Sequence, residues 1–310
     1  MARQRPGSVG VVLVCMALAG PANAQVDDRL EAYTGRNATG YMAPLVDGFR
    51  SNLNSGLFHS ARIPSGFSIS LEFNVAVTLF SEASRTFLAT TEGGFEPETT
   101  VRAPTVVGDP DAVYVTGDSA LVFAFPGGFD VDHMYLSCPQ LRVGSWKGSE
   151  VVGRLILYDT GSTEVGRLGV WGVGVRHSVS QYFTQLAPVD VALAAMWQHA
   201  ELHNDDDQDV LDSELATLAV HSGMALGSMY PYAGLSISWY SMAIRYRFDD
   251  IDVEPVELDF SSNADLQLTL GVSYRIGFVA AYGEYNVASE HSVAAGLSVQ
   301  FPFSNRSVTQ

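Results

Sequence analysis

The sequence predicts an all-β protein, namely an antiparallel transmembrane β-barrel of about twelve strands (range ten to fourteen) with an N-terminal helical segment. Three observations carry this prediction. The chain begins with an apolar leader, its composition is at once acidic and rich in apolar residues, and long segments alternate strictly between apolar and polar side chains.

The leader indicates export. Arg3 and Arg5 form a short basic segment before the apolar run 9–20, and Ala24 is a small residue of the kind that signal peptidase recognises. We therefore predict a signal peptide over residues 1–24 and an exported mature chain.

The two cysteines, Cys15 and Cys138, are consistent with this interpretation. Val14 precedes Cys15 where a lipoprotein signal needs a small side chain, which favours an ordinary signal peptide. Cleavage leaves Cys138 alone, so an intramolecular disulfide is excluded.

The charge excludes two classes of partner. Loss of Arg3 and Arg5 changes the formal net charge from −17 to −19 (−17 − 2), a field that repels nucleic acid and anionic membrane surfaces. Yet 47% of the residues are hydrophobic. Both facts fit a protein whose apolar residues face lipid and whose acids lie in loops. Since no second stretch approaches the roughly 20 residues of a spanning helix, a membrane form must be a closed barrel.

Residues 25–62 are predicted to form a helical plug or hatch-like segment. Tyr41, Leu45 and Phe49 recur at helical spacing, and Pro44 is placed in the first turn. These apolar side chains fit either a hydrophobic ligand pocket or a helix docked on the barrel wall.

The period changes to two at 66–80. Phe67, Leu71 and Phe73 belong to one face of this segment, whereas Glu72 and its alternate neighbours belong to the other. Fifteen residues exceed the usual five or six of a globular strand, but a tilted membrane-spanning strand needs about 9–11 and can extend further.

The barrel is predicted to occupy residues 63–303, followed by a short tail, 304–310. The region 92–118 is interrupted by Pro and Gly, and its sequence fits either two more strands or a long loop. The strand candidates are 66–80, 84–91, 119–125, 131–143, 150–158, 164–178, 187–200, 213–227, 231–248, 264–276, 277–287 and 290–303.

A soluble β-sandwich is the alternative, because it shows the same alternation. Its strands are typically shorter, with Lys and Glu on the wet face. The polar faces here carry mostly Ser, Thr, Gln, Asn and Gly, which favours the barrel.

Loop lengths give an independent check. If the last strand ends in the periplasm, counting backwards places the turn 287–290 outside together with the long acidic loops 249–263 and 201–212. The short turns 276–277 and 227–230 are then periplasmic. Outer-membrane barrels have this asymmetry.

Several segments also resemble a known family. The entry at 52–63, "LGVWGVGVRHSVSQYF" with the rest of 168–197, and "PYAGLSISW" are similar to an uncharacterised family of bacterial outer-membrane β-barrel proteins. The resemblance implies an exported barrel with a short helical N-terminal segment, broadly like the hatch-containing fatty-acid transporters. It implies no catalytic or ligand residues, and fold-level analogy does not establish function.

Four charged residues are predicted to point into the lumen: Glu72, Arg154, Arg275 and Glu284. Because the first and last strands pair on closure, Glu72 is expected near Arg275 and Glu284. The four residues fit either a buried ion-pair network or a permeation or ligand site.

Metal binding has weak support. Asp205, Asp207 and Asp209 have alternate spacing but lack the Gly and Glu of an EF-hand, so they fit either a solvated loop or a weak divalent site near lipopolysaccharide. His199 and His203 do not form a metal pair on a strand end.

No enzyme is predicted. "DTGS" at Asp159 echoes an aspartic protease and "GDSA" (117–120) echoes a lipase, but the first is ordinary turn chemistry and the second has no triad partners. No cofactor is expected.

The leading functional hypothesis is a passive conduit in the bacterial outer membrane for a small, possibly hydrophobic, solute. The rival is a non-transporting structural or adhesion barrel whose acidic external loops bind cations or lipopolysaccharide. Outer-membrane lipid and lipopolysaccharide are the expected partners, and the sequence leaves the oligomeric state open.

Overall fold

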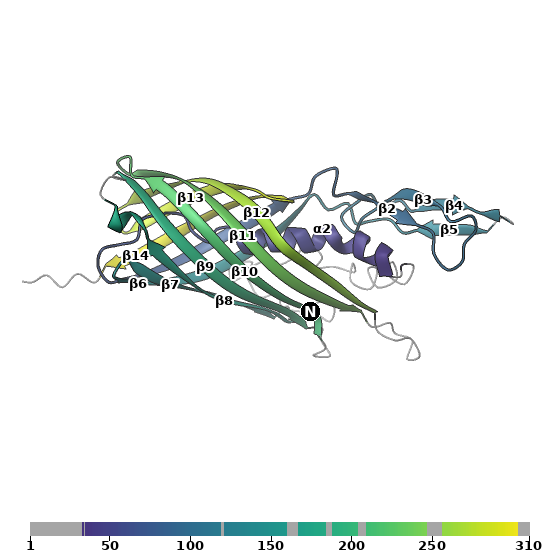
Figure 1. The fold of residues 1–310 in the computed structure, drawn as a ribbon, viewed down its shortest axis with the longest axis horizontal. Helices are drawn as coiled ribbons and strands as arrows, with labels where there is room; N and C mark the ends of the chain where they lie inside the picture. Colours follow the sequence, from purple (N-terminus) through teal and green to yellow (C-terminus); the bar gives the residue numbers. More distant parts are fainter. Residues whose placement is uncertain are drawn as a thin grey trace, which may run out of the picture.

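Ten antiparallel strands form a closed barrel that contains the C-terminal half of a long helix, α2 (Figure 1). The computed structural model describes residues 33, 35–118, 121–159, 167–183, 188–203, 209–246 and 256–302. The predicted signal peptide and the predicted tail 304–310 lie outside these residues. The helix is α2 (Gly35–Asn54), and one short 3-10 helix, η2, covers Ser180–Tyr182.

The barrel closes where β1 (Ser68–Leu79) pairs with both β14 and β6. Around the ring the order is β1, β14, β13, β12, β11, β10, β9, β8, β7, β6. The bounds of the other nine strands are β6 (His133–Trp146), β7 (Ser149–Asp159), β8 (Arg167–Ser178), β9 (Val189–His203), β10 (Asp209–Met224), β11 (Met229–Tyr246), β12 (Val256–Ile276), β13 (Val279–Val287) and β14 (His291–Pro302).

The alternation of β1 has the predicted consequence. Leu71, opposite Val299 of β14, is 56% exposed on the outside, whereas Glu72, opposite Ser298, is 4% exposed inside. The same alternation follows the ring and leaves an outer band of aliphatic side chains. Members that are at least half exposed include Leu71, Val151, Leu155, Leu157, Val175, Leu193, Leu218, Leu235, Leu266, Leu270, Ile276 and Leu297.

The strand count of about twelve is too high by two, although ten lies within the predicted range. The candidates 84–91 and 119–125 do not join the barrel. They contain β2 (Thr86–Thr90) and β5 (Val122–Phe125), which pair with β3 (Thr100–Pro104) and β4 (Val113–Thr116) in two separate two-stranded sheets. Four or five residues are too short to cross a bilayer, whereas the ten barrel strands are long enough.

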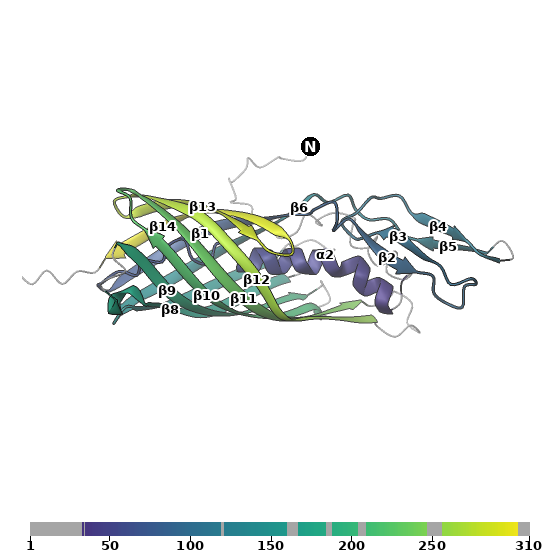
Figure 2. The same ribbon diagram turned by 45° about the horizontal axis from the view of Figure 1, so that its top comes forward.

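Residues 80–132, here named the projection, therefore leave the ring between β1 and β6 and extend beyond it (Figures 1 and 2). The region 92–118, for which the sequence allowed two strands or a long loop, contains the two strands β3 and β4.

The two ends of the barrel differ. At one end, the short-turn end, three of the four connections between barrel strands are short (147–148, 225–228 and 277–278), and the fourth, 179–188, is longer and contains η2. The other, the long-loop end, carries the projection, the connection 247–255 and the turn 288–290. The predicted alternation of connections is correct, but the two long loops are shorter than predicted because β10 begins at Asp209 and β12 at Val256.

Helix α2 begins earlier than the sequence indicated. Pro44 is the tenth residue of the helix rather than part of its first turn, so the carbonyl of Gly40 loses its usual partner. An internal proline costs about 3 kcal/mol in an isolated helix, and tertiary packing of both faces of α2 offsets this cost. No helix among the described residues is long and apolar enough to cross a bilayer.

Candidate functional site: a plug inside the lumen

The lumen is occupied by the chain itself. After α2, residues 55–61, here named the plug strip, continue along the inside of the barrel, where Leu57, Phe58 and Ala61 are at most 5% exposed. The strip forms no strand, so the barrel wall holds it by side chains rather than by a β-ladder.

Side chains of the wall bind the main-chain carbonyls of this part of the chain one after another. Each carbonyl from Leu53 to Leu57, and that of Ser60, accepts at least one hydrogen bond. The donors, in the order of the carbonyls, are Arg154 and Gln198 (Leu53), Gln267 (Asn54), Arg154 (Ser55), Asn74 (Gly56), Gln140 (Leu57) and Arg176 (Ser60).

Arg154 of β7 makes the central contact. Its Nη1 donates to the Leu53 carbonyl at 2.7 Å and its Nη2 to the Ser55 carbonyl at 2.9 Å, while Nε donates to Gln140 Oε1 at 3.1 Å. The side chain is buried. A cation at the C-terminus of α2 satisfies the last carbonyls of the helix and complements its dipole.

Glu284 of β13 holds the other side of the same turn. The Gly56 amide donates to its Oε1 at 2.6 Å and the Tyr232 hydroxyl to its Oε2 at 2.9 Å. Because Asn74 also donates to the Gly56 carbonyl at 2.9 Å, both main-chain groups of Gly56 are bound to the wall.

Gly56 provides a direct test of this arrangement. Its φ is +65°, and an added Cβ would lie 2.6 Å from Asn74 Nδ2. We expect Gly56→Ala to lower the free energy of unfolding by about 1–3 kcal/mol, because an L-residue is strained at this φ and Asn74 must move. Urea titration of the folded protein measures this change. In Gly66→Ala, the matched control, the added Cβ has no neighbour within 4 Å, so that variant should be near neutral. Equal effects at both positions would contradict the proposed packing.

Glu72 of β1 lies further along the strip, beside His59. Arg142 Nη2 donates to Glu72 Oε2 at 2.6 Å and lies 2.7 Å from His59 Nδ1, while Ser298 donates to Glu72 Oε1 at 3.1 Å. Because a guanidinium only donates, His59 Nδ1 is the acceptor. His59 also stacks on Tyr282 with ring centroids 4.5 Å apart.

Arg176 of β8 completes the polar wall. It donates to Glu150 Oε1 at 2.6 Å and to the Ser60 carbonyl, and its guanidinium lies 5.1 Å from the centroid of the Phe58 ring. Arg142, Arg176, Glu150 and His59 were not predicted from the sequence. The alternation could have indicated Arg142, which lies between the apolar residues Leu141 and Val143 and so belongs to the inward face of its strand.

Arg275 does not join this network. It is the next-to-last residue of β12, so it lies exposed at the short-turn end, where Nη1 donates to Gln300 Oε1 at 2.6 Å. The structure thus brings Glu72, Arg154 and Glu284 to the plug strip and its neighbours but leaves Arg275 at the rim.

At the long-loop end, α2 is fixed by a second polar cluster. Arg50 lies 3.3 Å from both Asp47 Oδ1 and Asp265 Oδ2, and Ser51 donates to the Glu290 carbonyl at 3.0 Å. Burial raises the pKa of the Glu290 carboxyl above its usual range, although a hydrogen bond from Ser84 opposes that shift.

The predicted plug residues form a core with the projection rather than a ligand pocket. Tyr41 is fully buried and donates to the Gly127 carbonyl at 3.0 Å, and Phe49 is 3% exposed in the same apolar cluster. Leu45 is half-buried against it. This cluster joins α2 to residues such as Val106 and Phe125 of the projection.

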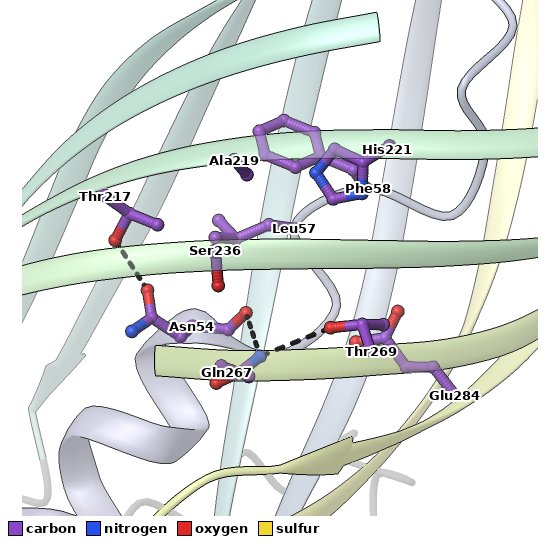
Figure 3. Close-up of a pocket in the computed structure, with 10 residues that line it drawn as sticks. All are labelled: Asn54, Leu57, Phe58, Thr217, Ala219, His221, Ser236, Gln267, Thr269 and Glu284. Carbon is purple, nitrogen blue, oxygen red and sulfur yellow. Dashed lines mark hydrogen bonds between the residues drawn. The ribbon is translucent and has the colours of Figure 1, made fainter. Parts of the chain in front are cut away.

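A small pocket lies between the strip and strands β10–β13 (Figure 3). Thr217 donates to Asn54 Oδ1 at 2.7 Å on one side, and the ring of Phe58 meets that of His221 edge-on, with centroids 4.9 Å apart. Within the described part of the chain, neither ring nitrogen of His221 has a hydrogen-bond partner. A buried imidazole of this kind needs solvent or another polar molecule beside it.

Of the three acidic candidates for a metal site, the structure describes only Asp209. Asp205 and Asp207 lie outside the described residues, and Asp209 is the first residue of β10, with Oδ1 2.8 Å from His203 Nδ1. His199 and His203 flank Glu201, whose Oε2 is 3.7 and 3.8 Å from their Nε2 atoms. Among the described residues, no group of three or more His, Cys, Asp or Glu side chains has the geometry to hold a metal ion.

A family model matches residues 7–301 and is described as a family of unknown function, DUF6588. The chain belongs to the DUF6588 family. This membership agrees with the predicted uncharacterised family of outer-membrane barrels. A search of curated proteins gave no match to this DUF6588 chain.

Solved outer-membrane barrels resemble the DUF6588 chain only remotely. The N-terminal barrel domain of Pseudomonas aeruginosa OprF shares 13% identity, with 50% of this chain and 98% of that one covered and a TM-score of 0.27. The transport unit of the autotransporter AIDA-I from Escherichia coli shares 8%, with 87% and 100% covered and a TM-score of 0.33. The Ralstonia pickettii toluene transporter TbuX shares 11%, with 79% and 91% covered and a TM-score of 0.22. Function must therefore be argued from the site.

Proposed function

We propose that this protein is an outer-membrane β-barrel whose lumen is closed at rest by its own plug strip and which presents the projection at the cell surface. The single observation that carries the closed state is the succession of wall side chains bound to consecutive main-chain carbonyls of the chain inside the lumen.

The outer surface of the ring supports the membrane location. Aliphatic side chains such as Leu71, Leu155 and Leu297 are 55–56% exposed there, and a closed ring leaves no unpaired strand edge toward lipid. In this proposal these side chains contact lipid and the acyl chains of lipopolysaccharide.

The length and packing of the projection support presentation. Its apolar core with α2 makes it a built element rather than a loose loop, and Tyr114 and Leu88, each 69% exposed, lie on its surface. Exposed apolar side chains on a surface element are typical of a contact surface for another molecule.

A gated conduit for a small solute is the second candidate. Because the strip is held by side chains and not by a β-ladder, it can shift within the lumen without opening the ring. The wall that it would uncover carries Glu72, Arg142 and Arg154, so this lining suits a polar solute better than a hydrophobic one. Binding of cations or lipopolysaccharide by the acidic loops stays a prediction.

Recordings in planar lipid bilayers distinguish the two candidates. We expect the wild-type protein, inserted and folded, to show no sustained single-channel current at low voltage, since the strip and its partners fill the lumen. Stable open levels at low voltage, with entry of small sugars into liposomes, would instead establish a conduit. Heat-modifiable migration on a gel serves as the control for folding.

A further inference from the structure

The chain enters the barrel from the long-loop end. Tyr33, the first described residue, is 1% exposed and lies against Tyr41, Phe87 and Phe125, with ring centroids 5.2–6.2 Å apart. Two of these rings belong to the projection. Asn37 is fixed at the same place, since its Nδ2 donates to the Thr90 carbonyl at 2.7 Å.

The chain leaves the barrel at the opposite, short-turn end. Arg62, directly after the plug strip, donates to Asp190 Oδ2 at 3.0 Å, near the start of β9, and lies over the Tyr230 ring. Strand β1 then begins at Ser68, opposite Gly144 and Pro302. Between Gly35 and Ser68 the chain therefore traverses the whole barrel.

The passage is enclosed on all sides. Because β1 is hydrogen-bonded to β14 on one side and to β6 on the other, the ring has no lateral opening through which α2 and the strip could have entered. An extended chain can cross such a passage only if its main-chain groups find partners, and the wall supplies them.

The contacts also reveal what the wall recognises. Arg154, Gln198, Gln267, Asn74, Gln140 and Arg176 all bind carbonyls, a group that every residue carries. The lumen is thus lined for the main chain of a polypeptide, and it also holds the side chains of Asn54, Ser55 and His59.

In outer-membrane barrels the short turns face the periplasm. Resting on the orientation in the proposed function, we infer that the barrel carries its own amino-terminal segment across the outer membrane, so that Gly35 and the start of α2 lie at the cell surface. The cargo of the lumen is then a polypeptide, the segment of this chain that ends at Ala61.

Cysteine labelling on intact cells tests the inference. In a Cys15→Ala, Cys138→Ser background, single cysteines replace three exposed residues: Arg36 at the start of α2, Tyr114 on the projection, and Ser228 at the short-turn end. With a membrane-impermeant maleimide, we expect Arg36→Cys to be labelled to the same extent as Tyr114→Cys, and Ser228→Cys only after permeabilisation.

The outcomes separate this inference from the proposed function. Labelling at 114 but not at 36 on intact cells would overturn the inference and leave the orientation intact. Protection of both until permeabilisation would overturn the orientation itself. Labelling at 36, 114 and 228 alike on intact cells would show no sidedness and overturn both.

An engineered disulfide tests whether the plug strip of the labelled molecules lies inside the barrel. Ser55 Oγ lies 2.7 Å from Ser292 Oγ on β14, so Ser55→Cys with Ser292→Cys should form a bond in the folded protein. Bond formation together with surface labelling at 36 places the segment in the lumen with its start outside. Reduced, unlinked cysteines in a heat-modifiable barrel would contradict the threading.

Discussion

Arg154→Met should open the lumen and destabilise the protein. The guanidinium is buried and donates to the carbonyls of Leu53 and Ser55. Gln198 still donates to the Leu53 carbonyl when Arg154 is removed, but the Ser55 carbonyl loses its side-chain donor. Each lost charged hydrogen bond costs about 1.5–3 kcal/mol, partly offset by relief of the desolvation of a buried cation. We expect a net loss of about 2–4 kcal/mol in the free energy of unfolding and a rise in open-channel events in bilayers.

Arg275→Met is the matched control, because it removes the same group from an exposed position at the rim. It should change the free energy of unfolding by less than about 0.5 kcal/mol and leave the bilayer record unchanged. If both variants behave alike, the position of Arg154 against the end of α2 has no special role in closing the lumen.

Leu297→Lys should prevent or strongly weaken insertion into lipid. Leu297 lies at the middle of β14, opposite Phe73 of β1, and is 56% exposed on the outer band. A lysine at the bilayer midplane of a barrel costs about 2–4 kcal/mol, whereas the same substitution on a water-facing strand is close to neutral. Folding into liposomes, followed by urea titration, measures the difference.

Tyr114→Lys provides the comparison for this second variant. Tyr114 is 69% exposed, but it belongs to the projection, outside the ring. We expect its folding free energy in liposomes to stay within about 0.5 kcal/mol of the wild type. A neutral Leu297→Lys would show that the outer band faces water and would refute the membrane location.

Alternation made the barrel strands predictable, because a period of two fixes which side chains face outward once one face is apolar. Segments 66–80 and 290–303 have this property, and both became barrel strands with the predicted faces. Segments 84–91 and 119–125 were wrongly counted with the barrel, since a short strand candidate does not reveal whether it pairs within the ring or with a neighbour outside it.

The contacts of the plug were harder to predict, because they join side chains to main-chain carbonyls. Every residue carries a main-chain carbonyl, so the residue types in "LNSGL" (53–57) do not indicate that its carbonyls bind Arg154 or Gln267. Pairing of charges was the natural expectation, and it placed Arg275 with Glu72. The actual partner is Arg142 of β6, which pairs with Ser70 and reaches Glu72 diagonally across the seam between β1 and β6. The intervening projection hides this pairing in the sequence.

Helix α2 belongs to two parts of the molecule at once. Its first half is built into the core of the projection through Tyr41, and its last turn ends against the lumen wall at Arg154. In the gated conduit proposed above, a rigid rod fixed in this way would link two equilibria. Any molecule whose binding to the projection shifts α2 must alter the balance between closed and open lumen. By reciprocity, the state of the lumen must alter the affinity of the projection for that molecule by the same factor.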